Sequence, residues 1–225
     1  MRALTLNSSP RSTGNSATLA RAVGQGLAAA GHHVETVQVG DVLTGFLRDC
    51  RTCRDRHGNC TIDDDYGGVF LDKMLSADGI IFATPVYWYG MSAHLKAAFD
   101  RMFCYVAGSY PGADDVVARL QGKRIGLVLS SEETFPTVTA AIAQQIQEYC
   151  RYTRSDFVGT VHGIGNARGE VRRDPRNPTQ TAHVFGARFF DALATDYRID
   201  TPRSGRVWGA EASSMQDNRP IDCYG

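Results

Sequence analysis

Short apolar runs alternate with longer stretches of helical periodicity, and this order constrains the fold more than any other feature. Five runs are short enough for buried strands: Ala3 to Leu6, Val34 to Val39, Gly79 to Ala83, Ile125 to Leu129 and Phe157 to Val161. Helical patterns follow them at Ala17 to Ala30, Val69 to Ser76, Ala93 to Tyr105, Val138 to Tyr152 and Thr181 to Tyr197. Strands that return through helices run parallel, and runs rich in Ile, Val and Leu fit burial on both faces. The sequence therefore predicts an α/β fold: a doubly wound, five-stranded parallel sheet with helices on both faces.

Two segments interrupt this order and divide the chain. At 225 residues the chain has the size of one large domain, which we place at residues 1–197. A polar, cysteine-containing insertion occupies residues 40–65, and residues 198–225 form a tail with no hydrophobic period. Three roles are open for the tail: an arm that wraps a second subunit, a passive surface segment or a lid over the active site. We favour the arm.

The charge and hydropathy of the chain argue against several classes of partner. The 24 basic and 24 acidic side chains cancel, so we expect no basic surface of the kind that nucleic acid or an anionic membrane requires. No apolar run approaches the roughly 20 residues of a membrane span, and the N-terminus lacks a signal-peptide pattern. The sequence therefore predicts a cytoplasmic protein whose six cysteines are thiols, thiolates or metal ligands.

The loop of residues 7–16 joins the first predicted strand to the first predicted helix. Ligands of parallel sheets bind beyond the carboxyl ends of the strands, and the unpaired N–H groups at a helix start attract anions. The loop adds hydrogen-bond donors from Ser8, Ser9, Ser12, Thr13, Asn15 and Ser16, and a charge from Arg11. The alternative is a polar turn with a helix cap at Asn15 or Ser16. The loop contains neither a G-x-x-x-x-G-K-[ST] motif nor a cysteine, so we expect a phosphate to be held there and not transferred.

A second polar and aromatic loop follows the third predicted strand. It carries three aromatic side chains, Tyr87, Trp88 and Tyr89. Exposed aromatic residues at a strand end are suited to covering a flat ring or a partner surface, although core packing is an alternative. Pro85 and Gly90 restrict the backbone, so the N–H groups between them can be directed at ring nitrogens and carbonyls. A third loop, from Ser130 to Phe135, can close the other side of such a site or serve only as a connection.

These motifs together resemble a known family. With Asn7-Ser8-Ser9-Pro10-Arg11, Gly14-Asn15-Ser16, Thr84-Pro85-Val86-Tyr87-Trp88 and Lys96 to Asp100-Arg101, residues 1–197 resemble the flavodoxin-like NAD(P)H-dependent FMN reductases. The resemblance implies strand order 2-1-3-4-5, bound FMN, and a homodimer or homotetramer with flavin sites near the subunit interface. Asn7 stands where the family usually has glycine, which affects the local turn. The candidate cofactor-binding residues are Ser8, Ser9, Arg11, Thr13, Asn15, Ser16, Pro85, Val86, Tyr87, Trp88, Tyr89, Gly90, Ser130 and Ser131.

Within this set the resemblance assigns the phosphate and the ring to different loops. Ser9, Arg11, Asn15 and Ser16 would hold the FMN phosphate, and Pro85 to Gly90 would line the isoalloxazine. The implied activity is transfer of hydride from NAD(P)H through flavin N5 to a small organic acceptor: a quinone, an azo or nitro compound, free flavin or a pathway intermediate. Because the cofactor performs the chemistry, no catalytic side chain is required.

Two other functional classes remain open. The first is an electron-transfer flavoprotein, of the flavodoxin or iron–sulfur type, without a small-molecule substrate of its own. Flavodoxins are usually strongly acidic and this chain is neutral, which favours the enzyme. The second is an interaction or sensory protein that uses the fold without redox turnover. The sequence identifies neither the electron acceptor nor a preference between NADH and NADPH.

The insertion contains Cys50, Cys53 and Cys60 in a C-x2-C-x6-C spacing. It resembles the cysteine-rich insertion of iron–sulfur flavoproteins, a branch of the same family with four cysteine ligands. Leu47 stands where the fourth cysteine would be. Four interpretations are open: structural thiols, a zinc site completed by His57, an iron–sulfur cluster and redox-active cysteines. We favour structural thiols, and therefore no metal.

Overall fold

Five parallel strands form the centre of the fold in a computed structural model of the chain, which describes residues 1–49 and 54–191. They are β1 (Arg2–Asn7), β2 (His33–Gln38), β3 (Gly79–Tyr87), β5 (Arg124–Ser131) and β6 (Asp156–Ile164). Their order across the sheet is β2-β1-β3-β5-β6, and the short strand β4 (Gly90–Met91) pairs antiparallel with the end of β3. The predicted order 2-1-3-4-5 is confirmed, because β5 and β6 are the fourth and fifth parallel strands along the chain.

The strands are buried on both faces, and their side chains divide the apolar interior into two clusters. Leu4 and Leu6 of β1 belong to the first cluster and Ala3 to the second, as the two-residue period of a strand requires. The next strands repeat this division: Ile80, Phe82, Leu127 and Leu129 join the first cluster, and Ile81, Ala83 and Val128 join the second. The alternation explains why the strand sequences are apolar almost throughout.

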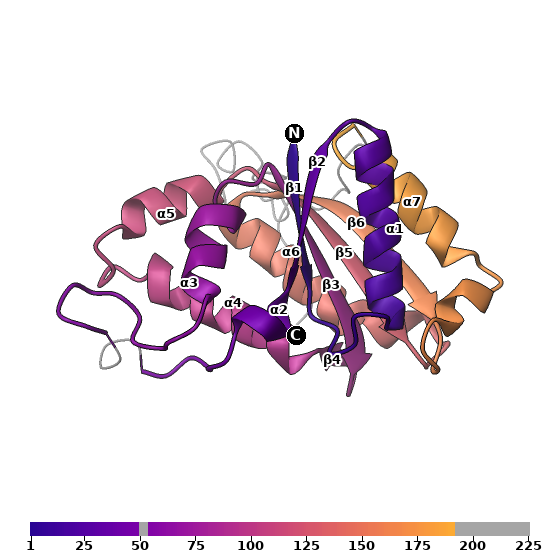
Figure 1. The fold of residues 1–225 in the computed structure, drawn as a ribbon, viewed down its shortest axis with the longest axis horizontal. Coiled ribbons are helices and arrows are strands. Elements are labelled where there is room, and N and C mark those ends of the chain that lie inside the picture. Colours follow the sequence, from indigo (N-terminus) through magenta and orange to yellow (C-terminus); the bar gives the residue numbers. More distant parts are fainter. Residues whose placement is uncertain (50–53, 192–225) are drawn as a thin grey trace, which may run out of the picture.

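Helices cover both faces of the sheet (Figure 1). Helices α1 (Asn15–Ala29) and α7 (Pro178–Ala187) pack on the second cluster, whereas α4 (Ala93–Val106) and α6 (Ala140–Thr153) pack on the first. The shorter elements are α2 (Val39–Val42), α3 (Tyr66–Gly68), α5 (Ala113–Leu120), the π-helix η1 (Val69–Met74), and the 3-10 helices η2 (Pro136–Thr139) and η3 (Glu170–Arg173). None of the helices in residues 1–49 and 54–191 has the length and apolarity needed to cross a membrane.

Helices α1 and α7 meet backbone to backbone at two glycines. A Cβ atom at Gly26 would lie 2.0 Å from the carbonyl oxygen of His183, and one at Gly186 would lie 2.0 Å from that of Val23. Interiors are close-packed, so a larger residue at either position would push the helices apart. This contact holds the end of the described chain against the helix that starts at the first loop.

The two largest differences between the observed and the predicted helices are a helix that is not predicted and a shifted last helix. Helix α5 is not predicted, although it buries Val116 and Leu120, which lie four residues apart on one face. The last predicted helix, Thr181 to Tyr197, starts earlier, at Pro178, because the fixed φ of proline suits the first turn of a helix. Helix α7 ends at Ala187, and residues 192–197 of that prediction lie outside the described residues, as does the tail of residues 198–225.

Candidate functional site

A cavity of about 230 Å³ lies at the carboxyl edge of the sheet, where β1, β3, β5 and β6 end. Eleven of the residues around it come from the first loop, the aromatic loop and the β5 loop, and nine of these belong to the predicted set. The whole lining consists of Ser9, Arg11, Gly14, Asn15, Ser16, Pro85, Val86, Tyr87, Ser130, Ser131, Glu132, Gly165 and Asn166. We refer to this space as the cradle cavity.

Internal hydrogen bonds fold the first loop into a closed turn. The Ser9 hydroxyl donates to the Arg11 carbonyl at 2.9 Å and accepts from the Arg11 N–H at 3.2 Å. Gly14 follows, and a Cβ atom there would lie 2.7 Å from Ser9 Oγ, so only glycine fits the turn without displacement. The Asn7 side chain accepts from the Ser9 N–H at 3.3 Å and donates to Gln38 Oε1 at 2.8 Å, which ties the loop to β2. Asn7 therefore braces the turn.

Ser16 is a buried residue in the lining of the cradle cavity. The residue is 1% exposed, and its Oγ has no hydrogen-bond partner among the described residues. The N-cap of α1 is Gly14, which offers no side-chain cap, so the alternative of a cap at Asn15 or Ser16 is wrong. A buried polar group without a partner costs roughly 1–3 kcal/mol. Ser16, the start of α1 and the exposed Arg11 thus bring hydrogen-bond donors together at one end of the cavity.

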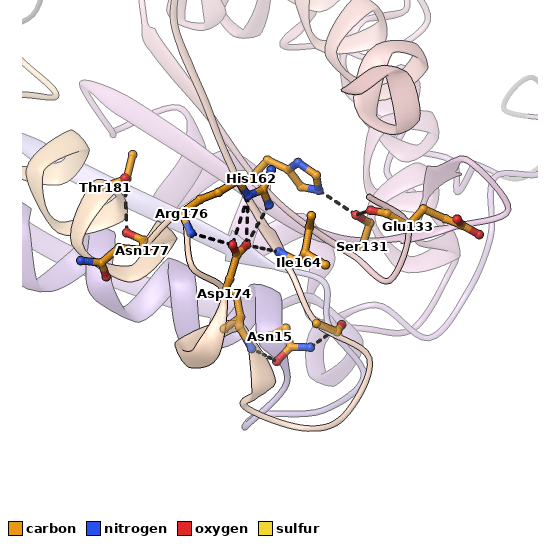
Figure 2. Close-up of polar contacts among 11 residues, drawn as sticks. Asn15, Ser131, Glu133, His162, Ile164, Asp174, Arg176, Asn177 and Thr181 are labelled. Carbon is orange, nitrogen blue, oxygen red and sulfur yellow. Dashed lines mark hydrogen bonds and ion pairs between the residues drawn. The ribbon is translucent and has the colours of Figure 1, made fainter. Parts of the chain in front are cut away.

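Asn15 connects the start of α1 to the loop that follows β6 (Figure 2). Its Nδ2 donates to the carbonyls of Gly165 at 2.7 Å and Ala167 at 3.1 Å, and its Oδ1 accepts from the Val171 N–H at 3.3 Å. The amide lines the cavity, but both of its ends are engaged by the protein. Asn15 therefore acts first as a clamp between two loops.

Two residues that the prediction took from the first loop, Ser8 and Thr13, lie outside the lining. The Ser8 hydroxyl is buried and donates to the Ala83 carbonyl at 2.9 Å, and it accepts from Ser92 Oγ at 2.8 Å. Ser8 thus joins the ends of β1 and β3 away from the cavity surface. Thr13 is exposed on the loop and does not line the cavity.

The aromatic loop is a two-residue hairpin between β3 and β4 with an unusual backbone. Trp88 and Tyr89 occupy its two central positions at φ values of 49° and 61°, the left-handed region that such hairpins normally fill with Asn-Gly or Gly. Left-handed φ in bulky residues costs about 1–3 kcal/mol each and persists where the surroundings fix it. Trp88 is 96% exposed, and the Tyr89 ring lies 6.0 Å from that of Phe135 in the β5 loop.

Three of the six predicted ring-binding residues line the cavity, and three do not. Pro85, Val86 and Tyr87 line the cradle cavity. The other three, Trp88, Tyr89 and Gly90, lie at or beyond the turn and are not part of the lining.

The β5 loop is held by a histidine of the neighbouring strand. Ser130 and Ser131 line the cavity, and the Ser131 hydroxyl donates to the Glu133 carbonyl at 2.8 Å. Nε2 of His162, on β6, lies 2.7 Å from the same hydroxyl (Figure 2). Burial lowers the pKa of His162, the nearby Arg176 lowers it further, and Asp174 opposes the shift. The imidazole is therefore neutral at physiological pH and supports the loop through Ser131.

We expect the His162 contact to make stability depend on pH. The folded-state pKa is below the unfolded value of 6.5, so the unfolded chain binds more protons and stability rises with pH across that interval. The contribution is complete above pH 6.5 and is lost as pH falls through the folded pKa. Urea unfolding at several pH values should show a smaller acid-induced loss of stability in His162→Gln than in the unchanged chain. Equal pH profiles would contradict this role.

The described part of the cysteine insertion contains a buried ion pair. Cys60 Sγ lies 3.7 Å from Arg101 Nη2, and Arg101 forms a buried ion pair with Asp64. His57 is exposed, and its Nε2 accepts from Arg56 Nε at 3.0 Å. In residues 1–49 and 54–191, no group of three or more His, Cys, Asp or Glu side chains could hold a metal ion. The predicted ligands Cys50 and Cys53 lie outside the described residues.

Sequence reasoning missed four residues of the cavity lining: Gly14, Glu132, Gly165 and Asn166. Gly165 and Asn166 directly follow β6, so the rule that placed the other loops at the carboxyl edge also applies to them. The signal was weak because the sequence after β6 has no dense group of hydroxyl or aromatic residues.

Known proteins are similar to this chain in sequence and in fold. Residues 1–152 match the family described as NADPH-dependent FMN reductase. An iron–sulfur flavoprotein of Methanocaldococcus jannaschii is 37% identical over 101 residues, covering 45% of this chain and 51% of that protein, so the match spans about half of the relative's length. A Bacillus subtilis protein named as an NAD(P)H-dependent FMN-containing oxidoreductase is 26% identical over 174 residues, covering 77% of this chain and 91% of the relative.

A solved structure gives the same fold independently of close sequence similarity. The NAD(P)H:quinone oxidoreductase from Methanothermobacter marburgensis superimposes with a TM-score of 0.60 at 17% identity, covering 84% of this chain and 96% of that one. The family match contains the first loop, the aromatic hairpin and the β5 loop, which together supply most of the cradle cavity. The chain belongs to the NADPH-dependent FMN reductase family.

Proposed function

We propose that this chain is an FMN-dependent NAD(P)H oxidoreductase that reduces a small organic acceptor. The observation that carries the proposal is the unpaired, buried hydroxyl of Ser16, a residue at the start of α1 that lines a cavity at the carboxyl edge of the sheet. Family membership and the relative named as an NAD(P)H-dependent oxidoreductase support the same conclusion.

The residues around the cradle cavity fit the phosphate of FMN. Ser16, Arg11 and the N–H groups at the start of α1 would bind it, with hydrogen bonds to a charged group worth about 1.5–3 kcal/mol each. Gly14 keeps the turn small enough for the anion to approach the backbone, since an added Cβ would meet Ser9 Oγ and the Arg11 carbonyl. Asn15 would act indirectly by holding the β6 loop over the site.

The other side of the cavity fits a flat ring. Pro85, Val86 and Tyr87 would form one wall, and Ser130 and Ser131 the opposite one. When bound, FMN supplies the hydride-accepting and hydride-donating chemistry. The protein's part would be to orient the ring with backbone N–H groups, including those of the β5 loop, which His162 supports through Ser131.

Several narrower expectations belong to this proposal. The acceptor would be a quinone, an azo or nitro compound, free flavin or a pathway intermediate. A cytoplasmic location, a homodimer or homotetramer and an arm formed by residues 198–225 stay predictions. The alternative, an electron-transfer flavoprotein with an iron–sulfur cluster, is favoured by the name of the Methanocaldococcus jannaschii relative and by the three cysteines of the insertion.

The absorption spectrum of the purified protein, followed by NADPH oxidation assays, tests the proposal. We expect flavin bands from tightly bound FMN, and NADPH oxidation that depends on an added quinone or azo compound. A pure electron carrier would hold flavin but would not oxidise NADPH without a reductase. Bands of an iron–sulfur cluster, confirmed by iron analysis, would support the alternative. Protein that contains no flavin and takes up none on titration would refute the proposal.

A further inference from the structure

A groove of about 410 Å³ lies away from the candidate site, with walls from α4 and α6. Met91 of β4, Phe99 of α4 and Ala141 of α6 form its apolar part. Lys96 of α4 and Glu148 of α6, with two glutamines of α6, complete the lining. None of its lining residues belongs to the cradle cavity. We refer to this space as the α4–α6 groove.

Two exposed aromatic side chains continue the groove along both helices. On α4, Lys96 and Phe99 line the groove, and Phe103, four residues beyond Phe99, is 53% exposed. On α6, Glu148 lines the groove, and Tyr152, four residues beyond it, is 73% exposed. Residues four apart share one face of a helix. The exposed apolar surface therefore extends past the groove on both helices, as expected of an interaction site.

The tail contains a segment suited to this groove. Ala141 and the two glutamines of the lining are exposed, so residues 1–49 and 54–191 leave the groove open. Beyond them, Val207 and Trp208 are adjacent, and Trp208 is the largest apolar side chain of the tail. Tryptophan buries more apolar area than most side chains and is enriched at the centres of interfaces.

The charges on either side of Trp208 match those of the groove. The segment Arg206-Val207-Trp208-Gly209-Ala210-Glu211 has a cation, an apolar centre and an anion, in that order. In the groove, the Lys96 side chain on α4 is 50% exposed and the Glu148 side chain on α6 is 43% exposed. Each also pairs with a neighbour on its own helix, in surface contacts that contribute little to stability. Arg206 beside Glu148 and Glu211 beside Lys96 would fix the direction of a bound segment.

The described chain ends far from its own α4–α6 groove. Helix α7 packs on the second apolar cluster, whereas α4 and α6 pack on the first, across the sheet. Phe189, near the end of the described residues, packs over Gly79 and Gly126, near the starts of β3 and β5. Met91 instead follows the carboxyl end of β3. The two places therefore lie on opposite faces of the sheet and at opposite ends of its strands.

This separation favours the groove of a second copy of the chain. The fourteen residues between Asp191 and Arg206 span at most about 50 Å when fully extended. A path over the surface of the same copy covers about 30 Å along the nine residues of β3, and about 30 Å more across the sheet and its two helix layers. The extended segment does not span that path, whereas the groove of a neighbouring copy can lie close to Asp191.

We propose that residues 206–211 of one copy bind the α4–α6 groove of a second copy, with the Trp208 ring inside the groove. Each copy carries one segment and one groove, so a two-fold pair satisfies both grooves and closes as a dimer. The inference goes beyond the proposed oxidoreductase function and does not depend on bound flavin. It gives the predicted arm a defined binding surface.

Analytical ultracentrifugation of the full-length chain and its variants tests the proposal. We expect a dimer whose dissociation constant rises by about 30-fold or more in Trp208→Ala, the usual effect of removing a tryptophan from the centre of an interface. Ala141→Glu should also raise it, because the new carboxylate would occupy an exposed part of the groove. Tyr224→Ala, which removes another aromatic ring of the tail, and Ala118→Glu, at an exposed alanine of α5, are the matched controls. Both should leave the dissociation constant unchanged.

Tryptophan fluorescence locates the segment independently. In a Trp88→Phe background Trp208 is the only tryptophan, and its emission should be blue-shifted in the dimer and lose that shift on dilution or with Ala141→Glu. Blue-shifted emission from a monomer would place the segment in its own groove and overturn the exchange. A dimer that Ala141→Glu dissociates but Trp208→Ala does not would show that the body of the second copy covers the groove. That result, a dimer unaffected by both variants, or a monomer with exposed Trp208 would overturn the proposal.

Discussion

Arg101→Met is expected to lower the free energy of unfolding by about 3–5 kcal/mol, the usual cost of leaving one member of a buried ion pair alone. The side chains of Arg101 and Asp64 are each 1% exposed, and Nη2 of Arg101 lies 2.9 Å from Asp64 Oδ1. Burial raises the pKa of Asp64, but the Arg101 hydrogen bonds and N–H groups from Thr44 and Tyr66 outweigh it and lower the pKa. Without Arg101, the carboxylate would have to be buried unpaired or take up a proton.

The double variant Arg101→Met/Asp64→Leu is the control for this prediction. It removes both charges, so urea unfolding should show a smaller loss of stability than the sum of the two single variants. Additive effects would show that the two side chains are not coupled. Arg101 also donates to the Gly45 carbonyl at 3.3 Å and lies near Cys60, so the single variant should expose the Cys60 thiol to faster alkylation. An unchanged alkylation rate would mean that the pair does not hold the insertion in place.

The sheet could be predicted from the sequence because its signal is local. Alternating strands and helices define the layers. The two-residue period of a strand then places Leu4 and Leu6 on one face of the sheet and Ala3 on the other. Helix α5 is not predicted, because its eight residues give little more than two turns of helical periodicity. The sequence of the π-helix η1 has the pattern of an ordinary α-helix, because the wider turn of a π-helix depends on packing and not on composition.

The candidate site could be predicted in position but not in the roles of its residues. Ser8 and Ser16 are the same residue type in the same loop, yet the first is bonded to Ala83 and the second is unpaired. The clamp of Asn15 reaches the carbonyl of Gly165, 150 residues away in sequence, and nothing local to either residue indicates it. Sequence spacing identifies which loops meet at the sheet edge, whereas the partner of each hydroxyl or amide follows from the tertiary contacts.

The difference between Ser16 and Asn15 leads to the second large effect that we expect. Ser16→Ala should weaken FMN binding by about 10- to 150-fold, which corresponds to one hydrogen bond of about 1.5–3 kcal/mol to a charged group. The stability of the FMN-free protein should stay the same or rise, because the hydroxyl that is removed has no partner among the described residues. Asn15→Ala should instead act mainly on folding. It should lower the stability of the FMN-free protein, because three hydrogen bonds to the β6 loop are lost.

Thr18→Val provides the matched control. It distinguishes an effect on FMN affinity that comes from the cavity lining from one that comes from a disturbed helix. Thr18 is on the same helix, is buried and also has a hydroxyl without a partner in the described chain, but it does not line the cradle cavity. Fluorescence titration with FMN should therefore give the same affinity for Thr18→Val as for the unchanged chain, and urea unfolding should show no loss of stability. If Ser16→Ala bound FMN as tightly as Thr18→Val, the phosphate would not lie at the start of α1. A loss of FMN in both variants would instead indicate a general disturbance of the helix.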